Sequence, residues 1–367
     1  MIQTAPQVML KPTSVFCASF ELSATKWKLA FSDADRRRLV TIDAGDWISF
    51  DREVAKARLR FGLEEQTKLF TCYEAGRDGF WIHRELLKRG IENVIVDPSS
   101  IEVSRRARRA KTDSLDAISL VEKLAKHLRG EKVWQVIQVP TLADEDARRP
   151  HRERERLTKE RTAHITRVKA LLALFGVRLN DVRHFEKVQE RLPPALRAEV
   201  IRELDRLKLV NEQLVGLAAA RKEAVREHQV PNALKIEQLE TLKAIGPTTA
   251  TVLVSELFGW RSFKNGKQVG ACAGLAPTPY SSGDLEREQG ISKAGNKRVR
   301  VLCVEIAWVW LRHQPESALA KWFEQRFAKG SGRSRRVGIV ALARKLLVAL
   351  WRFVEHGLVP EGAILKS

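Results

Sequence analysis

Three apolar runs decide the N-terminal fold: VFCASF (residues 15–20), KWKLAF (residues 26–31) and RLVTI (residues 38–42). Each run is rich in aromatic or β-branched residues, and short polar breaks separate them. Such composition and spacing are typical of short strands that follow one another in an antiparallel meander. The sequence therefore predicts a three-strand meander at the start of the first domain.

Helices and strands alternate in the next part of the chain. We expect a helix over residues 47–62, a strand over 68–73, a helix near 78–89 and a strand over 93–96. Strands that are joined through helices pair in parallel. The sequence predicts a meander extended by βαβ units, which together form an α/β domain over residues 12–140.

The composition indicates a protein that binds a polyanion. The 367 residues include 65 Lys and Arg against 45 Asp and Glu, a formal net charge of +20. Nucleic acid is the expected polyanion, with a basic membrane-surface protein as the alternative. We find no membrane span, secretory signal or lipidation motif, and we predict a cytoplasmic, nucleoid-associated bacterial protein without a membrane partner.

The four cysteines favour a reducing compartment. Cys17, Cys72, Cys272 and Cys303 are widely spaced, with no C-x-x-C pair and no His at zinc-finger spacing. We expect reduced, mostly buried thiols and no structural zinc.

Two further domains follow, so the predicted fold class is a multidomain α/β plus α protein. Residues 141–230 hold two charged stretches with apolar residues at helical spacing, which predict either a helical hairpin or an intermolecular coiled coil. Residues 231–367 are expected to be mostly helical. There, Ile245-Gly246-Pro247 lies between two apolar stretches. It predicts a helix-hairpin-helix motif that binds phosphate through Gly246, or an ordinary tight turn between helices.

Basic and acidic residues meet at one junction. Five cations within seven residues lead into Thr112, which can cap a helix with Asp113 and Asp116 on one face of its first turn. Carboxylates suit Mg²⁺ and cations suit phosphate, but a capped helix after a solvated basic loop explains the segment equally well. The five cations are Arg105, Arg106, Arg108, Arg109 and Lys111.

Two more carboxylates lie at expected strand ends. Glu21 ends the first strand, and Glu74 follows the strand over residues 68–73. In an α/β sheet, ligands bind at such strand ends, and a helix N-terminus can bring Asp113 and Asp116 alongside. Four carboxylates there would suit a two-metal Mg²⁺ site for phosphodiester chemistry.

A Pro-rich segment, Gly274–Gly283, is expected to be a rigid loop that ends in Ser281-Ser282-Gly283, ahead of a helix over 297–313. A serine before glycine is ordinarily a turn residue. Residues Gly330–Arg336 are expected to form a flexible basic loop.

The motifs together resemble the DEDD-type insertion-sequence transposases, which are recombinases guided by a bridge RNA. The resemblance covers nearly the whole chain, and its strongest segments are FELS (20–23), YEAG (73–76), KTDSLD (111–116), GLAP (274–277), SG (282–283) and ISKAGN (291–296). It implies an RNase H-like (RuvC-like) domain, a coiled-coil segment and a transposase domain. The family pattern has Asp at the first acidic position, where this chain has Glu21, whose extra methylene moves the carboxylate.

The resemblance also implies roles. The Mg²⁺-binding tetrad falls on Glu21, Glu74, Asp113 and Asp116, and the catalytic serine falls on Ser282, with Ser281 adjacent. Carboxylates and serine would come from different protomers of a dimer or tetramer, and serine attack would link DNA covalently to the protein. Partners would be a guide (bridge) RNA with target and donor DNA. The expected backbone contacts include Lys293, Lys297, Arg298, Arg333, Arg335 and Arg336.

Two other functions remain open at this point. A metal-dependent nuclease would use water in place of serine and leave no DNA bound to protein. A non-enzymatic nucleic-acid-binding protein would use the same carboxylates structurally. Basic runs and the helix-hairpin-helix pattern fit all three.

Overall fold

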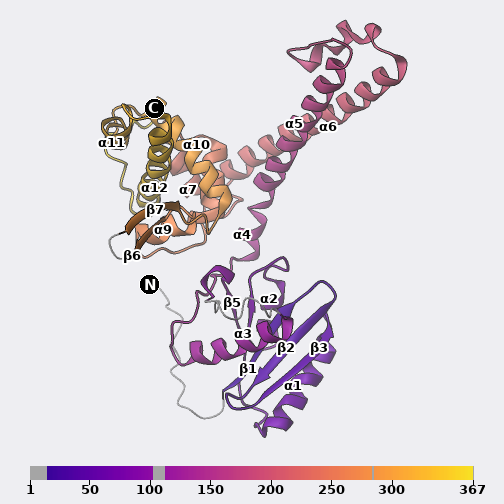
Figure 1. Cartoon of the computed structure of the whole chain (residues 1–367), viewed down its shortest axis with the longest axis vertical. Helices are drawn as coiled ribbons and strands as arrows, with labels where there is room; N and C mark the ends of the chain where they lie inside the picture. The colour runs from indigo at the N-terminus through magenta and orange to yellow at the C-terminus, as the bar shows by residue number, and fades with distance from the viewer. Residues whose placement is uncertain (1–14, 102–111, 283–284, 367) are drawn as a thin grey trace. The chain divides into compact units, whose positions relative to one another are not determined.

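The chain divides into two compact units, residues 1–139 and residues 140–367 (Figure 1). The computed structural model describes residues 15–101, 112–282 and 285–366. Within these ranges, no helix is both long enough and apolar enough to cross a membrane.

The first unit is built on a five-stranded sheet with the order β3-β2-β1-β4-β5. The strands are β1 (Phe16–Leu22), β2 (Lys26–Ser32), β3 (Arg37–Asp43), β4 (Leu69–Glu74) and β5 (Glu92–Val96). The first three strands pair antiparallel, whereas β4 pairs in parallel with both β1 and β5. The predicted meander with parallel extension is confirmed.

Helices cover both faces of this sheet, because successive side chains of a strand point to opposite faces. The face that carries Phe16, Ala18 and Phe20 packs on α1 (Trp47–Phe61) and α2 (Trp81–Lys88). The face that carries Cys17 packs on α3 (Asp113–Leu128).

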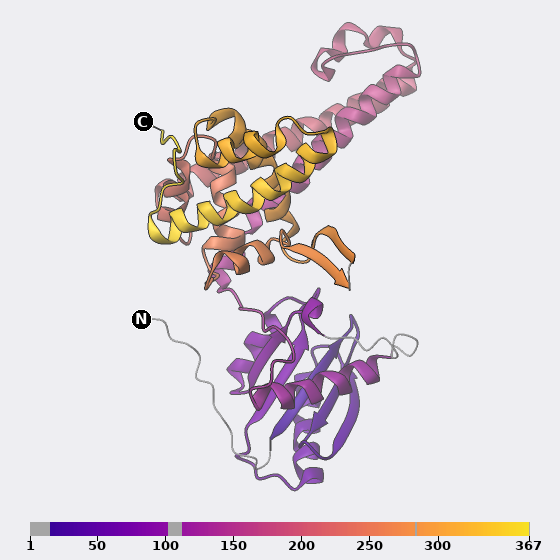
Figure 2. The same ribbon diagram turned by 60° about the vertical axis from the view of Figure 1, so that its left-hand side comes forward.

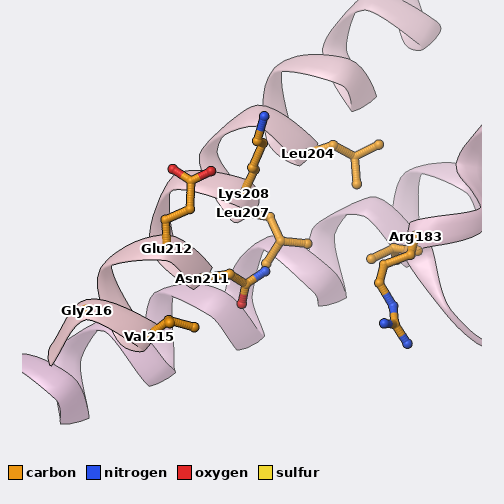
Figure 3. A pocket seen from close by; sticks show the side chains of 9 residues that line it. Arg183, Leu204, Leu207, Lys208, Asn211, Glu212, Val215 and Gly216 are labelled. Atoms are coloured by element: carbon orange, nitrogen blue, oxygen red, sulfur yellow. The ribbon is translucent and has the colours of Figure 1, made fainter. Parts of the chain in front are cut away.

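The second unit begins with a helical hairpin. The short α4 (Leu142–Asp146) precedes α5 (Arg149–Ala173), which packs along α6 (Pro194–Arg226). Two short turns of 3₁₀ helix, Val182–Lys187 and Gln189–Arg191, lie between the long helices. The two helices pair within one chain, as the hairpin alternative predicts. A cavity of about 650 Å³ lies along α6, walled by Leu204, Leu207 and Val215 (Figure 3).

The rest of the second unit is mostly helical. It contains α7 (Ala233–Glu240), α8 (Pro247–Leu253), a π-helical turn η5 (Val254–Phe258), α9 (Gly266–Cys272), β6 (Pro277–Ser282), β7 (Leu285–Ile291), α10 (Lys297–His313), α11 (Ala318–Phe327) and α12 (Gly332–His356). The long α12 packs against α10 and α11 (Figure 2). Its core residues Leu342, Leu346 and Leu350 are fully or almost fully buried, as is Trp310 of α10.

Two loop predictions are wrong. Residues Gly332–Arg336 form the first turn of α12, because the Ser331 hydroxyl caps that helix by accepting a hydrogen bond from the Ser334 amide at 3.3 Å. Residues Pro277–Ser282 form a strand that pairs with β7. Prolines are tolerated there because a two-stranded sheet has an open edge on each strand.

The turn between α7 and α8 differs in detail from the glycine-centred turn predicted around Gly246. Gly246 is extended (φ −96°, ψ 167°), and the left-handed residue is Ala244 (φ 84°). Gly246 therefore does not supply the positive φ of this turn. The helix-hairpin-helix assignment stays a prediction.

Candidate carboxylate site and serine hairpin

Glu21 and Glu74 lie at the same edge of the sheet. In the parallel pair β1/β4, Phe20 lies beside Tyr73, so the next residue on each strand is a glutamate. Because side chains alternate along a strand, Glu21 shares a face with Ser19, and Glu74 shares one with Cys72. This is the face that α3 covers.

Buried hydrogen bonds fix α3 on that face. The Ser19 hydroxyl donates to the Ala117 carbonyl at 2.6 Å, and the Cys72 thiol donates to the Leu120 carbonyl at 3.7 Å. These contacts hold the first half of α3 against the carboxyl-terminal halves of β1 and β4. Burial raises the pKa of Cys17 to about 12 and that of Cys72 well above its ordinary value, so both thiols are neutral packing groups.

The first turn of α3 is built as predicted. The Thr112 hydroxyl accepts from the Leu115 amide at 3.3 Å, and Asp113 and Asp116 are the acidic residues of the first turn. Asp113 is exposed and Asp116 is half-buried. The N-terminal end of a helix favours negative charge, which stabilises both carboxylates where they stand.

Lys28, which is not among the residues predicted from the sequence, joins the two parts of this site. Lys28 lies directly opposite Glu21 in the β1/β2 pair, and its Nζ donates to the Ser114 hydroxyl of α3 at 3.0 Å. The signal was available, because alternation in KWKLAF puts Lys28 on the same face as buried Ala30, where a lysine is unusual.

Glu21 and Glu74 open onto one cavity of about 360 Å³. Its described lining consists of Phe20–Ala24 and Glu74–Asp78, without Asp113 or Asp116. Nowhere in residues 15–101, 112–282 and 285–366 do three or more His, Cys, Asp or Glu gather closely enough to share an ion. Mg²⁺ is commonly held by one or two carboxylates and retains several waters, so the Glu21–Glu74 pair fits it.

The second unit holds the predicted serine on the β6–β7 hairpin. Ser282 is the last residue of β6 and pairs with Leu285, and Ser281 pairs with Glu286. The side chains of both serines lie outside the described part of the chain.

Two motifs of the sequence form the base of this hairpin. The Lys293 amide donates to the Gly274 carbonyl at 3.1 Å, and the Asn296 amide donates to the Cys272 carbonyl at 2.7 Å. The backbones approach so closely that a Cβ at Gly295 would stand 2.4 Å from the Cys272 oxygen. Gly295 is therefore required for close packing, as is Gly274, which is left-handed (φ 68°).

A buried charge cluster that the sequence did not predict adjoins this base. Glu256, in the π-helical turn, is 1% exposed and accepts hydrogen bonds from His151 at 2.8 Å, from Arg152 at 2.8 and 3.0 Å, and from Asn296 at 3.0 Å. Burial acts to raise the pKa of Glu256, but the hydrogen bonds from His151 and Arg152 and the charge of Arg152 outweigh it and hold the pKa far below its ordinary value. The cluster ties the start of α5 to the cap of α10.

Comparisons with known proteins assign the family. Residues 236–321 match the family model described as "Transposase IS116/IS110/IS902 family". Over 99% of its length the chain is 43% identical to the putative transposase y4rJ of Sinorhizobium fredii, of which the match covers 98%. The chain belongs to the IS116/IS110/IS902 family of transposases. It is also 26% identical to the transposase for insertion sequence element IS1111A of Coxiella burnetii (87% of this chain, 86% of the relative) and 26% identical to that for IS1328 of Yersinia enterocolitica (82% and 90%).

The chain is therefore a DNA transposase, and the family match falls within its second unit. Residues 236–321 run from α7 into α11 and include Glu256 and the serine hairpin, but none of the four predicted carboxylates. The match to y4rJ covers 99% of this chain and therefore includes the sheet that carries Glu21 and Glu74.

The predicted nucleic-acid contacts of this transposase differ in exposure and in ion pairing. Arg298 pairs with Glu155 at 2.7 Å, whereas Lys293 and Lys297 are exposed. Three arginines are exposed on the first turn of α12, namely Arg333, Arg335 and Arg336. The basic run from Arg105 to Lys111 lies outside the described residues.

Proposed function

We propose that this transposase is guided by an RNA and exchanges DNA strands through Ser282, with Glu21, Glu74, Asp113 and Asp116 holding Mg²⁺. The observation that carries the proposal is the pair Glu21 and Glu74, which share one cavity at one sheet edge. The Asp-bearing turn of α3 lies on the same face. This arrangement supports an RNase H-like (RuvC-like) domain.

The carboxylates would act as fixed oxygen ligands. Glu21 and Glu74 are set by the strand register, and Asp113 and Asp116 are set by the Thr112 cap. When bound as one or two ions, Mg²⁺ supplies positive charge against the phosphodiester oxygens. Lys28, beside Glu21, would keep the start of α3 at the strand ends through its bond to Ser114.

The serine would act as the nucleophile. Its Oγ forms a bond to the scissile phosphorus, and the bond from phosphorus to the leaving sugar oxygen breaks, which leaves one DNA end on Ser282 and one free hydroxyl. Attack by the hydroxyl of another strand reverses the step, so strands are exchanged without hydrolysis. In this proposal the carboxylates of one protomer serve the serine of another, within a dimer or tetramer.

Guidance by RNA is supported by charge. The formal net charge is +20, and cations are abundant on the first turn of α12 and at the start of α5. Such surfaces bind phosphate backbones without reading sequence. Base pairing with a bridge RNA would then choose the target and donor DNA.

Replacement of the serine tests the proposal. Ser282→Ala should abolish covalent DNA–protein adducts on a denaturing gel while RNA binding survives, and the neighbouring Ser281→Ala serves as the matched control. Adducts that persist in Ser282→Ala and vanish in Ser281→Ala would move the nucleophile by one residue. Free 5′-phosphate or 3′-hydroxyl ends without any adduct in the unmodified protein would establish the nuclease alternative instead.

A further inference from the structure

A large groove runs along α12 at the base of the serine hairpin. Its volume is about 1070 Å³, and α12 forms most of one wall. Pro277, Gly290 and Ile291 at the base of the β6–β7 hairpin also line it. The opposite walls come from the ends of α9 and α11 and from residues 358–361. Figure 2 shows α12 along its length, as the long yellow helix.

The α12 wall alternates cations with small apolar residues. Arg336, Val340, Arg344, Val348 and Arg352 follow one another at intervals of four residues, and all five line the groove. Residues four apart lie on the same side of a helix. At 1.5 Å per residue, successive arginines are about 12 Å apart along the axis.

The groove is strongly positive. Glu361 is the single acid among its described lining residues. Lys345 lies over the Trp322 ring at 4.7 Å. In the described part of the chain, none of the cations that line the groove pairs with a carboxylate. The cations of the lining are Lys267, Lys293, Arg333, Arg336, Arg344, Lys345 and Arg352.

Close packing against α9 braces the middle of this wall. A Cβ at Gly270 would lie 3.0 Å from Nε of Arg344, and one at Gly266 would lie 2.7 Å from a methyl carbon of Val348. The two glycines therefore let α9 approach α12, and the Arg344 side chain lies against α9. An arginine that is already held loses less conformational freedom when it binds a ligand.

We propose that this groove binds an unpaired DNA strand and leads it along α12 to the β6–β7 hairpin. A groove lined by seven cations and one acid favours a polyanionic ligand. The valines and prolines of the lining favour a ligand that also has apolar surface. Bases and sugars expose such surface when the strand is not paired. A transposase acts on DNA, which makes a DNA strand the expected occupant.

The chemistry of transposition creates such a strand, because a cleaved strand must leave one duplex before it joins another. The direction towards the hairpin rests on the proposed role of Ser282, whereas binding of the strand does not. Failure of the serine assignment would therefore leave the groove intact, and the two proposals are tested separately.

Binding of labelled oligonucleotides to the full-length protein tests the groove. Arg336→Ala together with Arg344→Ala should weaken binding of single-stranded DNA about tenfold or more. It should also reduce the slope of log K against log salt by about 1.4, since each lost phosphate contact removes roughly 0.7 on single strands. Arg312→Ala is the control, because Arg312 is an exposed arginine of α10 in the same unit but lies outside the groove lining. That variant should bind almost normally.

Photocrosslinking locates the ligand independently of stability. A photoreactive residue at Val340 should crosslink to single-stranded DNA more strongly than to the duplex or to single-stranded RNA of the same sequence. Preferential crosslinking to RNA, to duplex or to a second copy of the protein would overturn the proposal. Equal losses in Arg312→Ala and Arg336→Ala, with circular dichroism spectra unchanged, would overturn it as well.

Discussion

Two groups of carboxylates in this chain lie in different surroundings. Glu21 and Glu74 are half-buried at a sheet edge and open onto a cavity, whereas Glu256 is buried and its oxygens accept four hydrogen bonds from the chain itself. A carboxylate already saturated by its own protein holds elements together. A carboxylate that lines a cavity stands where a ligand can reach it. Surroundings rather than residue type therefore separate the candidate site from the structural cluster.

The first prediction concerns activity at the sheet edge. Glu74→Gln should lower strand transfer by roughly a hundredfold or more, about 3 kcal/mol, because it removes one anionic ligand from a metal-assisted step. The side chain keeps its size, so the thermal midpoint should change little. Strand transfer and thermal unfolding would be measured on the same preparation.

Asp78→Asn is the matched control for this variant, since Asp78 lines the same cavity but lies outside the proposed tetrad. Its strand transfer should stay within a few-fold of normal. Normal strand transfer by Glu74→Gln would contradict the assignment of Glu74 to the candidate site.

The second prediction concerns stability at Glu256. Glu256→Ala should lower the free energy of unfolding of the second unit by about 2–3 kcal/mol, because it leaves His151 and Arg152 without their buried partner. The value is at the lower end for a buried pair, because the Arg152 side chain is 42% exposed. Urea denaturation followed by tryptophan fluorescence would measure it.

Glu155→Ala provides the comparison for that loss. Glu155 joins the same helices, α5 and α10, through Arg298, but the two side chains are 40% and 43% exposed. An exposed pair contributes about 0–1 kcal/mol, so the control should be nearly as stable as the unmodified protein. Equal losses in the two variants would mean that burial does not distinguish Glu256.

The third prediction is the pH dependence of that cluster. The folded-state pKa of Glu256 lies below its ordinary value of 4.5, so the unfolded chain binds the proton first as the pH falls. The stabilisation is complete above about pH 5 and is lost progressively as the pH falls towards the folded-state pKa. Between about pH 5 and pH 3 the unmodified protein should lose more stability than Glu256→Gln, which has no proton to gain there. Parallel slopes for the two proteins would contradict this.

Local signals predicted much of the fold and one half of the candidate site. The helix over residues 297–313 is predicted with the bounds that the structure gives it, and Thr112 is predicted as the cap of the helix that it does cap. Capping residues and apolar periodicity lie within a few residues of each other, so a single sequence carries them. The placement of Glu21 and Glu74 at strand ends followed from the same kind of signal.

Long-range pairing could not be predicted in this way. His151 and Glu256 are 105 residues apart in the chain, and nothing near either residue indicates the other. Glycine and serine dominate residues 330–334, a composition that predicts a loop, although Ser331 is the cap of α12. Its helical state depends on burial of Ile339 and Leu342 in the core, a tertiary contribution that local propensity does not contain.

The smallest expected effect tests how the Asp-bearing turn is held. Thr112→Ala should cost about 1 kcal/mol at α3, because the Leu115 amide loses its side-chain acceptor. Thr141→Ala removes the corresponding cap of α4, through the amide of Asp144, and should cost a similar amount. If the turn that carries Asp113 and Asp116 serves the carboxylate site, only Thr112→Ala should also reduce strand transfer at saturating Mg²⁺. Equal activity in the two variants would show that α3 holds its first turn through Ser19 and Lys28 without the cap.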